Sequence, residues 1–430
     1  MDTYRGTAVV IPTRNRAELA AVAIRSVLAQ AGGALAGVLV SDNSNDSEES
    51  GRLAAFCEAA GDARLHYVRP PESLPMSPHW HWAAGRALEL ADASHVTFLT
   101  DRMVFRDGAL SKLARVASLH PKRVVSYMHD KVADDGVPVR VHLNPWSGKL
   151  YRIESESLLR AVSRSRLYEP LPRMLNCHVP RAVLLALCGR HGSFFGSIAP
   201  DFSFCFRALA AERDILFLDE SLIFHHALNR SNGASFVRGE VTRDSADFMA
   251  GLRGGGDYFA APVPGILTVH NAIIHEYCVA RDETGSAKFA PVDEEKYLGT
   301  IASELGDIVN PPARRAVEEQ LAARGWQPAP AAPHTPLWRK LLSPSRVWGR
   351  VSRAVGKAGG AAAEGGRDEC PSFPTVEAAV DYARTARGAE VEASPWAEPL
   401  DMEELPMPAL RAGEATPPAG GGAAAAGGAS

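Results

Sequence analysis

The 430-residue sequence lacks clustered cysteines, a signal-peptide pattern and long apolar runs. Its six cysteines are scattered and form no C-x-x-C pair. Because a zinc site needs clustered ligands, the spacing predicts buried free thiols in a reducing compartment. Strand-like residues begin almost at the N-terminus, and no run of about 18 residues is apolar and uncharged. We therefore expect a cytoplasmic protein without a transmembrane helix, and peripheral membrane contact stays open.

The sequence also lacks an excess of charge of one sign. Its 46 Lys and Arg residues oppose 50 Asp and Glu residues, so the formal net charge is −4. No general basic field is present to attract nucleic acid, and we expect no nucleic-acid partner. The hydrophobic content of 46% is ordinary for a globular protein.

Apolar, β-branched runs alternate with stretches of helical periodicity in the first 120 residues. The pattern predicts strands at 7–12, 36–41, 65–69 and 95–100, and helices at 16–31, 47–60, 78–91 and 107–119. Strands that alternate with helices pair in parallel through right-handed crossovers. The sequence therefore predicts an α/β fold with a mostly parallel sheet between two layers of helices.

The middle and the end of the chain are less regular. We predict strands at 123–128, 138–143, 214–218 and 222–224, and helices at 154–164, 180–190, 200–212, 266–281, 293–308 and 312–324. The expected organisation is a main domain over 1–238, a helical appendage over 239–325, and a Pro/Ala/Gly-rich linker with a largely disordered tail over 326–430. A basic stretch at 339–357 is predicted to be disordered, a packed helix or an amphipathic surface helix.

Polar side chains follow two of the predicted strands directly. Thr13 and Arg14 come after the first strand, and Asp42 comes after the second. In an open α/β sheet, ligands bind at the carboxyl ends of the strands. A hydroxyl, a guanidinium and a carboxylate at this edge suit a nucleotide, because the carboxylate accepts from a base N–H or a sugar hydroxyl.

With these segments in order, the chain resembles a family 2 glycosyltransferase of the GT-A fold over residues 7–230. The motifs that carry the resemblance are VVIPTRNR at 9–16, SVLAQ at 26–30, VSDNSND at 40–46, MSPHW at 76–80 and FLTD at 98–101. The resemblance implies a Rossmann-like three-layer αβα domain. It also implies inverting, hexosyltransferase-like transfer of a sugar from a nucleotide-diphosphate donor. Polysaccharide, lipid-linked and small-molecule acceptors all stay open.

The resemblance implies donor contacts for residues at the strand ends. These residues are Pro12, Thr13, Arg14, Asp42 and Arg69. Asp42 stands where relatives hold the base or ribose, and Arg69 is expected to reach the base. The alternatives are a turn residue for Asp42, a helix-start charge for Arg14 and a surface position for Arg69. The pair at 79–80 (HW) is expected to close the donor side or to pack in the core.

The run Asp101-Arg102-Met103 departs from the family pattern. Relatives carry an Asp-any-Asp motif there, whose carboxylates hold Mn²⁺ or Mg²⁺ against the diphosphate. Three accounts stay open: Asp101 binds a divalent cation with a distant partner, Arg102 supplies positive charge to the diphosphate, or Arg102 makes a structural salt bridge in a degenerate site. His225 and His226 are the candidates for the missing metal ligand.

Asp201 is the candidate general base. Pro200 predicts a helix start, which places Asp201 in the first helical turn, where a family acid usually stands. The carboxylate would take the proton of the acceptor hydroxyl as its oxygen attacks the anomeric carbon. The alternative role is a helix cap. Two rival functions are a non-catalytic nucleotide-sugar binder, favoured by Arg102 and Met103, and a nucleotidyltransferase. The latter is disfavoured by the lack of a Gly-rich phosphate loop with lysine.

Overall fold

The computed structural model describes most of the chain up to residue 326 and two short segments beyond it. The described residues are 3–30, 32–90, 93–134, 137–144, 146–196, 198–227, 230, 260–263, 268–308, 310–326, 371–385 and 397–399. Among these residues, no helix has the length and apolar character needed to cross a membrane. The basic stretch at 339–357 lies outside the described residues.

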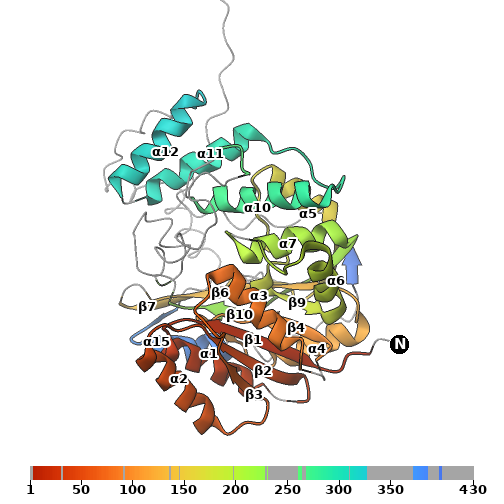
Figure 1. Ribbon diagram of the computed structural model, residues 1–430, viewed down its shortest axis with the longest axis vertical. Helices are drawn as coiled ribbons and strands as arrows, with labels where there is room; N and C mark the ends of the chain where they lie inside the picture. Colours follow the sequence, from red (N-terminus) through yellow and green to blue (C-terminus); the bar gives the residue numbers. More distant parts are fainter. Residues whose placement is uncertain are drawn as a thin grey trace, which may run out of the picture.

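A mixed β-sheet forms the centre of the molecule, and its first part is parallel (Figure 1). Its strands, in the spatial order β3-β2-β1-β4, are β1 (Thr7–Thr13), β2 (Leu35–Asp42), β3 (Leu65–Val68) and β4 (His95–Phe98). All three pairings are parallel. Since parallel strands end at the same edge, the residues after β1, β2 and β4 meet there. The predicted parallel pairing is confirmed.

The second part of the sheet contains both parallel and antiparallel pairs. The spatial order continues from β4 as β9-β6-β10-β8-β12, with β5 paired to β10 and β7 to β6. The bounds are β5 (Met103–Phe105), β6 (Val125–Ala133), β7 (Val139–His142), β8 (Leu150–Glu154), β9 (Cys177–Pro180), β10 (Asp214–His225) and β12 (Ala397–Pro399). Strand β9 pairs antiparallel with both β4 and β6, and so joins the two parts.

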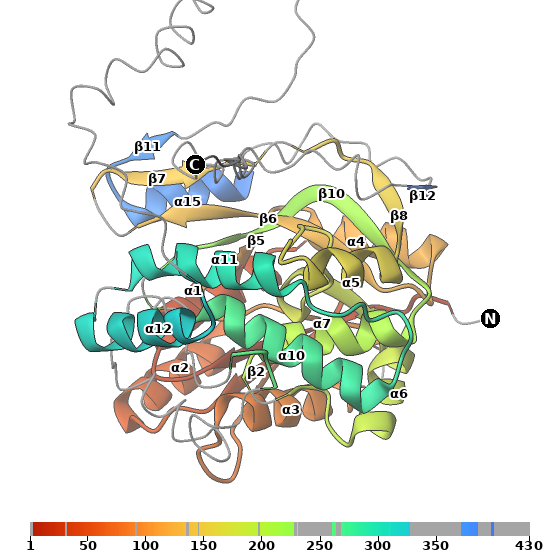
Figure 2. The ribbon, with the colours of Figure 1, turned by 90° about the horizontal axis from the view of Figure 1, so that it is seen from above.

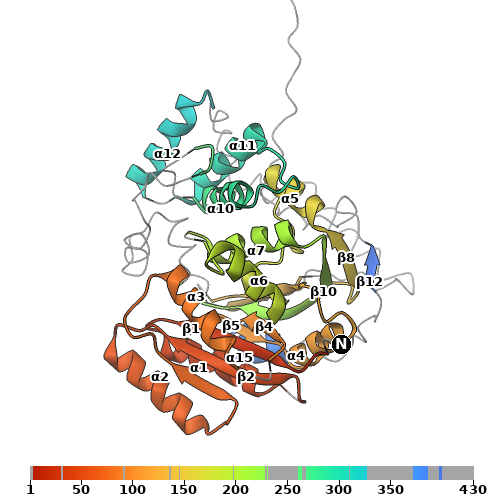
Figure 3. The ribbon, with the colours of Figure 1, turned by 45° about the vertical axis from the view of Figure 1, so that its right-hand side comes forward.

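Helices cover both faces of the sheet (Figure 3). One face packs on α1 (Ala17–Leu28), α2 (Ser47–Ala60) and α4 (Ala109–Leu119). The other face packs on α3 (Met76–Ala87), α6 (Arg181–His191) and α7 (Pro200–Ala211). Neighbouring residues of β1 serve the two faces in turn: Val9 belongs to the first core and Val10 to the second. The arrangement is the expected three-layer αβα fold.

A further group of helices lies beyond α7 (Figure 1). Its members are α5 (Ser155–Ser163), α10 (Val269–Thr284), α11 (Glu294–Glu304), the 3₁₀ turn η4 (Leu305–Asp307) and α12 (Pro311–Ala323). Phe206 on α7, Tyr277 on α10 and Tyr297 on α11 belong to one hydrophobic cluster and are fully buried. The helices after residue 268 therefore share the core of the preceding domain, while the boundary predicted at residue 238 falls outside the described residues.

Local capping explains why one predicted helix has the expected bounds. The side chain of Asp46 accepts hydrogen bonds from the backbone N–H groups of Glu48 and Glu49, which starts α2. Gly61 ends the helix with a left-handed φ of 60°. By contrast, the two strands predicted at 214–218 and 222–224 are one strand, β10, whose register with β6 shifts between Leu218 and Ile223. The polar residues that suggested two separate strands lie at this irregularity.

Part of the predicted disordered tail is folded, which corrects the expectation for 371–385. This segment forms β11 (Ser372–Phe373), which pairs with β7, and helix α15 (Val376–Thr385) (Figure 2). Ala379 and Ala383 are fully buried against strand residues such as Val141. A short amphipathic helix can therefore bury apolar surface although the surrounding composition predicts disorder. Residues 327–370, 386–396 and 400–430 lie outside the described residues.

Candidate functional site

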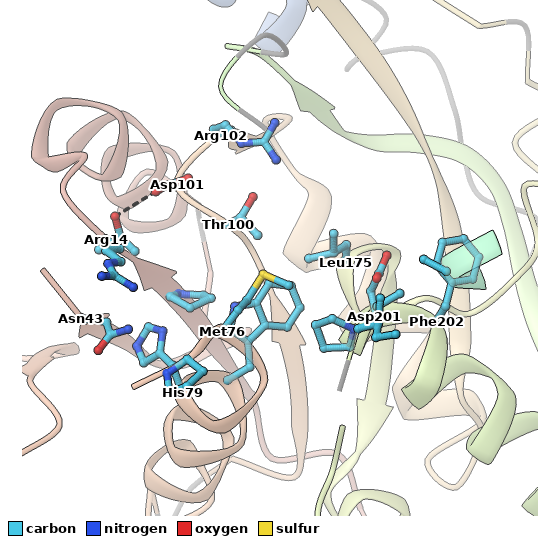
Figure 4. A pocket seen from close by; sticks show the side chains of 18 of the residues that line it. Arg14, Asn43, Met76, His79, Thr100, Asp101, Arg102, Leu175, Asp201 and Phe202 are labelled. Atoms are coloured by element: carbon cyan, nitrogen blue, oxygen red, sulfur yellow. Dashed lines mark hydrogen bonds between the residues drawn. The ribbon is translucent and has the colours of Figure 1, made fainter. Parts of the chain in front are cut away.

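The ends of β1 and β4 open into a cavity of about 370 Å³ (Figure 4). The opposite wall comes from the start of α7 and the start of α10. Six of the residues predicted from sequence lie in its lining: Pro12, Thr13, Arg14, Asp101, Arg102 and Asp201. Figure 4 shows Asp101 and Asp201 on different walls of the cavity. Both carboxylates therefore belong to the wall of one cavity.

A second cavity of about 430 Å³ lies next to the first. Asp42 and Arg69 line it, together with loop residues 70–73, and Asn43 lines both cavities. The side chain of Asn43 donates to the carbonyl of Leu74 at 2.7 Å and accepts from its N–H at 2.9 Å. The loop before α3 is thereby fixed beside the end of β2. The residues predicted to hold the nucleotide are therefore divided between two adjoining spaces.

Asp42 is fully buried, and both of its oxygens accept hydrogen bonds. The N–H of Ser44 donates to Oδ1 at 2.9 Å, and the hydroxyl of Tyr67 donates to Oδ2 at 2.7 Å. Burial alone would raise the pKa of Asp42, but these hydrogen bonds outweigh it and hold the pKa below its ordinary value. Arg69 Nε is 3.9 Å from Oδ2, and Arg69 Nη2 donates to the carbonyl of Ser44 at 2.7 Å. Asp42 is thus an ionised anchor of the strand end, with Arg69 held beside it.

His79 and Trp80 line the first cavity from α3. His79 Nε2 is hydrogen-bonded to the Ser41 hydroxyl at 2.8 Å, and burial lowers the pKa of His79 to about 4. Trp80 is 8% exposed and packs against Phe98 and Phe195 with ring centroids 5.6 and 5.8 Å away. Both residues therefore combine a packing role with a place in the cavity wall.

Asp101 is buried at the carboxyl end of β4, where two groups engage its oxygens. The Thr13 hydroxyl donates to Oδ2 at 2.9 Å, and Arg16 Nη1 lies 3.6 Å from Oδ1. Arg16 also donates to the carbonyl of Arg230 at 2.8 Å. The partly buried Arg102 lines the same cavity; burial lowers its pKa, while the Asp101 charge acts in the opposite direction. Three arginines, at 14, 16 and 102, therefore line this cavity.

Met103 does not face the cavity. It is fully buried in β5, where it pairs with His225, and its sulfur accepts from the N–H of Thr100 at 3.4 Å. The third position of the altered acidic motif is therefore a core position in this chain.

The two predicted metal-binding histidines have different surroundings. His225 packs edge-on against His129, with ring centroids 4.8 Å apart, and neither histidine at 225–226 is part of the cavity lining. His226 is buried, and burial lowers its pKa, while the charges of Asp134 and Asp101 act in the opposite direction and that of Arg102 adds to the lowering. Asp134 Oδ1 and His226 Nε2 are buried and make no hydrogen bond within the described part of the chain. His226, rather than His225, therefore belongs to the Asp101 cluster.

A preformed metal centre is not present among the described residues, because no three His, Cys, Asp or Glu side chains converge closely enough. Asp101 and Asp134 are close enough to His226 for their charges to act on it. Carboxylate oxygens suit Mg²⁺ and Mn²⁺, and imidazole is a further ligand for Mn²⁺. The two orphaned buried atoms in this set fit a cation that is completed by ligands from a bound substrate.

Asp201 lies in the first turn of α7, after Pro200, as the sequence predicts. Burial raises its pKa, while the charge of Arg173 and the backbone amides of Phe202 and of Asp201 itself act in the opposite direction. The Arg173 guanidinium lies over the Phe202 ring, 5.8 Å from its centroid, and Arg173 Nε donates to Asn176 at 3.2 Å. A carboxylate with a raised pKa at a cavity wall is suited to accept a proton.

Sequence reasoning missed several residues of the cavity. Arg16 lies in the 9–16 motif, and this position could have identified it as a cavity residue. Asn43 could have been identified in the same way, because it directly follows Asp42. Thr268, which caps α10, and Val269 and Ile273 on that helix lie about 70 residues after Asp201. No local sequence pattern predicts that this helix completes the cavity wall.

The comparisons with known proteins give one family match. Residues 8–169 match the family model described as "Glycosyl transferase family 2". No curated protein sequence matches the chain significantly. The matched range contains β1 to β4, with Thr13, Asp42 and Asp101, and it ends before Asp201.

Solved structures similar to the chain include TarS of S. aureus and GalNAc-T7. TarS 1–349 in complex with UDP-GlcNAc has 13% identity and a TM-score of 0.39, and the match covers 74% of this chain and 87% of that one. A second structure of TarS has 14% identity and a TM-score of 0.40, and the match covers 74% of this chain and 53% of that one. GalNAc-T7 with UDP, GalNAc and Mn²⁺ has 14% identity and a TM-score of 0.37, and the match covers 52% of this chain and 44% of that one. At these scores, the likenesses assign neither a donor nor an acceptor.

Proposed function

We propose that this chain, whose residues 8–169 form a glycosyl transferase family 2 domain of the GT-A fold, is an inverting glycosyltransferase. It moves a sugar, most simply a hexosyl group, from a nucleotide-diphosphate sugar to a hydroxyl acceptor. The observation that carries the proposal is the single cavity lined by Asp101 on one wall and Asp201 on another. Donor binding would use the main domain, 1–238, and the appendage, 239–325, would contribute the acceptor side through α10.

Two adjoining cavities suit the two halves of such a donor. We propose that the cavity with Asp42 and Arg69 binds the base and ribose, since Arg69 is half-exposed and its guanidinium is held beside Asp42. The cavity with Arg14, Arg16 and Arg102 would bind the diphosphate and sugar, since guanidinium groups pair with phosphate oxygens. Asn43, which lines both, would lie near the junction.

The transfer is written as one displacement. The acceptor oxygen attacks C1 of the sugar while Asp201 takes the proton from the acceptor hydroxyl. The bond between C1 and the diphosphate oxygen breaks, and its electron pair leaves with the diphosphate, so the configuration at C1 inverts. Positive charge develops on the sugar ring, and negative charge grows on the leaving group. The raised pKa of Asp201 makes its carboxylate a better base than an exposed one.

A divalent cation, Mn²⁺ or Mg²⁺, is proposed to accompany the diphosphate. Asp101, Asp134 and His226 are the residues that would hold it. Such ions are usually bound by one or two carboxylates together with substrate phosphates. The cation supplies positive charge to the diphosphate, and Arg102 supplies further positive charge from the chain itself.

The test starts with a thermal-shift panel of UDP-, GDP- and dTDP-sugars, with and without Mn²⁺. Turnover of the best donor is then measured for the wild type and for Asp201→Asn. We expect the variant to keep the nucleotide-induced shift and to lose roughly 10²–10⁴-fold in kcat, the usual contribution of a general base. Undiminished transfer by Asp201→Asn would reject this residue as the base.

A non-catalytic nucleotide-sugar binder is the second candidate, because Arg102 and the core residue Met103 replace two positions of the usual acidic motif. Such a protein would show a donor-induced thermal shift but neither hydrolysis nor transfer with any acceptor. Turnover that depends on Asp201 would exclude it.

A further inference from the structure

Glu276 is a buried carboxylate that the proposed reaction does not use. It lies in the middle of α10 and is 1% exposed. Its Oε1 accepts hydrogen bonds from the backbone N–H groups of Ile198 at 2.8 Å and of Ala199 at 2.9 Å. These two amides come directly before Pro200 and Asp201. A side chain from the C-terminal helices therefore fixes the chain that enters α7.

The entry to α7 has no side-chain cap of its own. Ala199 is the N-cap residue, and alanine offers no oxygen to the first amides of a helix. Ser203 compensates in part, because its hydroxyl accepts from the N–H of Gly196 at 2.5 Å and donates to the carbonyl of Pro200 at 2.9 Å. Glu276 supplies two further hydrogen bonds to this segment, across the interface between two helices.

Close packing at Gly196 supports a specific fit. A Cβ atom on this glycine would lie 2.3 Å from Oε2 of Glu276 and 2.8 Å from Cβ of Ser203. Such approaches are too short for any side chain, so the residue must be glycine while Glu276 holds this position. The carboxylate thus lies directly on the backbone of the turn.

The charge of Glu276 makes this anchor costly. Burial raises the pKa of Glu276 to about 7, while the amides of Ala199 and Ile198 and the charge of Arg207 act in the opposite direction and Asp201 adds to the rise. Simple packing would be served better by an apolar side chain, because a buried carboxyl without an ion pair costs stability. A carboxyl at this position accepts hydrogen bonds from the two backbone amides next to Asp201, which an apolar side chain could not do.

We propose that Glu276 is a positioning residue that holds the turn before α7 so that Asp201 faces the anomeric carbon of the donor. This inference rests on the proposed role of Asp201 as the base. Glu276 itself is absent from the cavity lining; the residues of α10 that line the cavity are Val269, Ala272 and Ile273. Helix α10 is therefore joined directly to the residues that lead into α7.

The chain offers a matched control in the same helix pair. Glu283, two turns after Glu276 on α10, makes a bidentate pair with Arg207 of α7 at 2.9–3.1 Å. Removing it weakens the α7–α10 interface and leaves the hydrogen bonds to the N–H groups of Ile198 and Ala199 in place. A purely structural role for Glu276 predicts that the two positions behave alike.

The experiment compares Glu276→Ala, Glu276→Gln and Glu283→Ala in the full-length chain, using the donor selected by the panel and water as the acceptor. We expect Glu276→Ala to lower kcat by about 100-fold, with the donor KM and the nucleotide-induced thermal shift unchanged, if the two lost hydrogen bonds count for about tenfold each. Glu276→Gln keeps an acceptor oxygen and should retain kcat to within about fivefold. Glu283→Ala should lower Tm while its kcat stays within about twofold of the wild type.

The outcomes separate this inference from the function it rests on. If Asp201→Asn abolishes turnover while Glu276→Ala is as fast as the wild type, the positioning role is wrong and the base is retained. An equal loss of kcat in Glu276→Ala and Glu283→Ala, in step with Tm, would also overturn it. If the wild type turns over no donor, or if Asp201→Asn is fully active, the proposed function fails first. Should Glu276→Ala not fold, a Glu276→Gln protein that folds but loses more than about fiftyfold in kcat would contradict the rescue.

Discussion

Arg102 directly follows Asp101, and the charges of Asp101, Arg16 and Asp134 act on its guanidinium. The guanidinium keeps its charge at neutral pH in spite of its burial, because an arginine pKa is far above 7. In the proposed reaction, an arginine and a cation would both act on one diphosphate. Their contributions are separable, since only one of them is removed by a chelator.

Chelation and substitution at Arg102 give one prediction at this scale. With EDTA, we expect turnover of the best donor to fall by at least about tenfold, and Mn²⁺ should restore it, because one ion contact to phosphate is worth about 1.4 kcal/mol or more. Arg102→Ala should weaken binding of the nucleoside diphosphate by about tenfold and leave binding of the free nucleoside unchanged. Titration calorimetry measures both, with Arg102→Lys as the charge-retaining control.

The contrary outcome is specific. Full activity after chelation, with loss of activity in Arg102→Ala, would show that no cation is needed and that arginine side chains, Arg102 among them, neutralise the diphosphate.

At the residue scale, the sequence predicts those site residues that follow a strand directly. Thr13 and Asp101 are examples, because a strand end has a fixed place at the edge of a parallel sheet. The pairing of Arg16 with Asp101 is not predictable in this way, since it depends on side-chain direction across 85 residues of sequence. The distinction between His225 and His226 has the same origin: adjacent strand residues point to opposite faces, and the sequence does not state which face is which.

At the scale of elements, local signals decided which predictions held. Helix α2 matches the predicted range because Asp46 and Gly61 mark its ends. Strands β8 and β9 were missed, because each is short and is stabilised by neighbours distant in the sequence. Helix α15 was missed because the composition around it masked its four-residue apolar spacing, in which Ala379 and Ala383 face the core.

The α7–α10 contact leads to a prediction about stability and pH. The fold raises the pKa of Glu276 from 4.5 to about 7, so its neutral form is favoured in the folded chain. Stability from this group is fully present below pH 4.5 and is lost as the pH rises through about 7. The loss amounts to about 3 kcal/mol of unfolding free energy between pH 5 and 8. Glu276→Gln should remove this loss and therefore gain stability relative to the wild type as the pH rises.

Urea unfolding of both proteins at pH 5, 6, 7 and 8 measures this difference, and Glu283→Gln controls for removal of a carboxylate elsewhere in the same interface. A constant difference between Glu276→Gln and the wild type over this range would show that Glu276 does not titrate as the fold requires.

At the scale of the whole molecule, the order of the parallel strands and the three layers follow from alternating apolar runs and crossovers, so the fold class was predictable. The union of the main sheet with the C-terminal helices was not. The cavity is built from β1, β4, α3, α7 and α10, and the last of these lies in the part of the chain that the sequence suggested was an appendage. Only long-range packing, such as that of Phe206 with Tyr277, brings it to the site.

The configuration of the transferred sugar shows whether the reaction is one displacement at C1 with Asp201 as the base. A donor with an α-linked sugar is mixed with the enzyme, and proton NMR records the anomeric configuration of the first product before it mutarotates. We expect a β product from the wild type and almost none from Asp201→Asn, because one displacement at C1 with Asp201 as the base inverts the centre. An α product, or an undiminished β product from the variant, would contradict it.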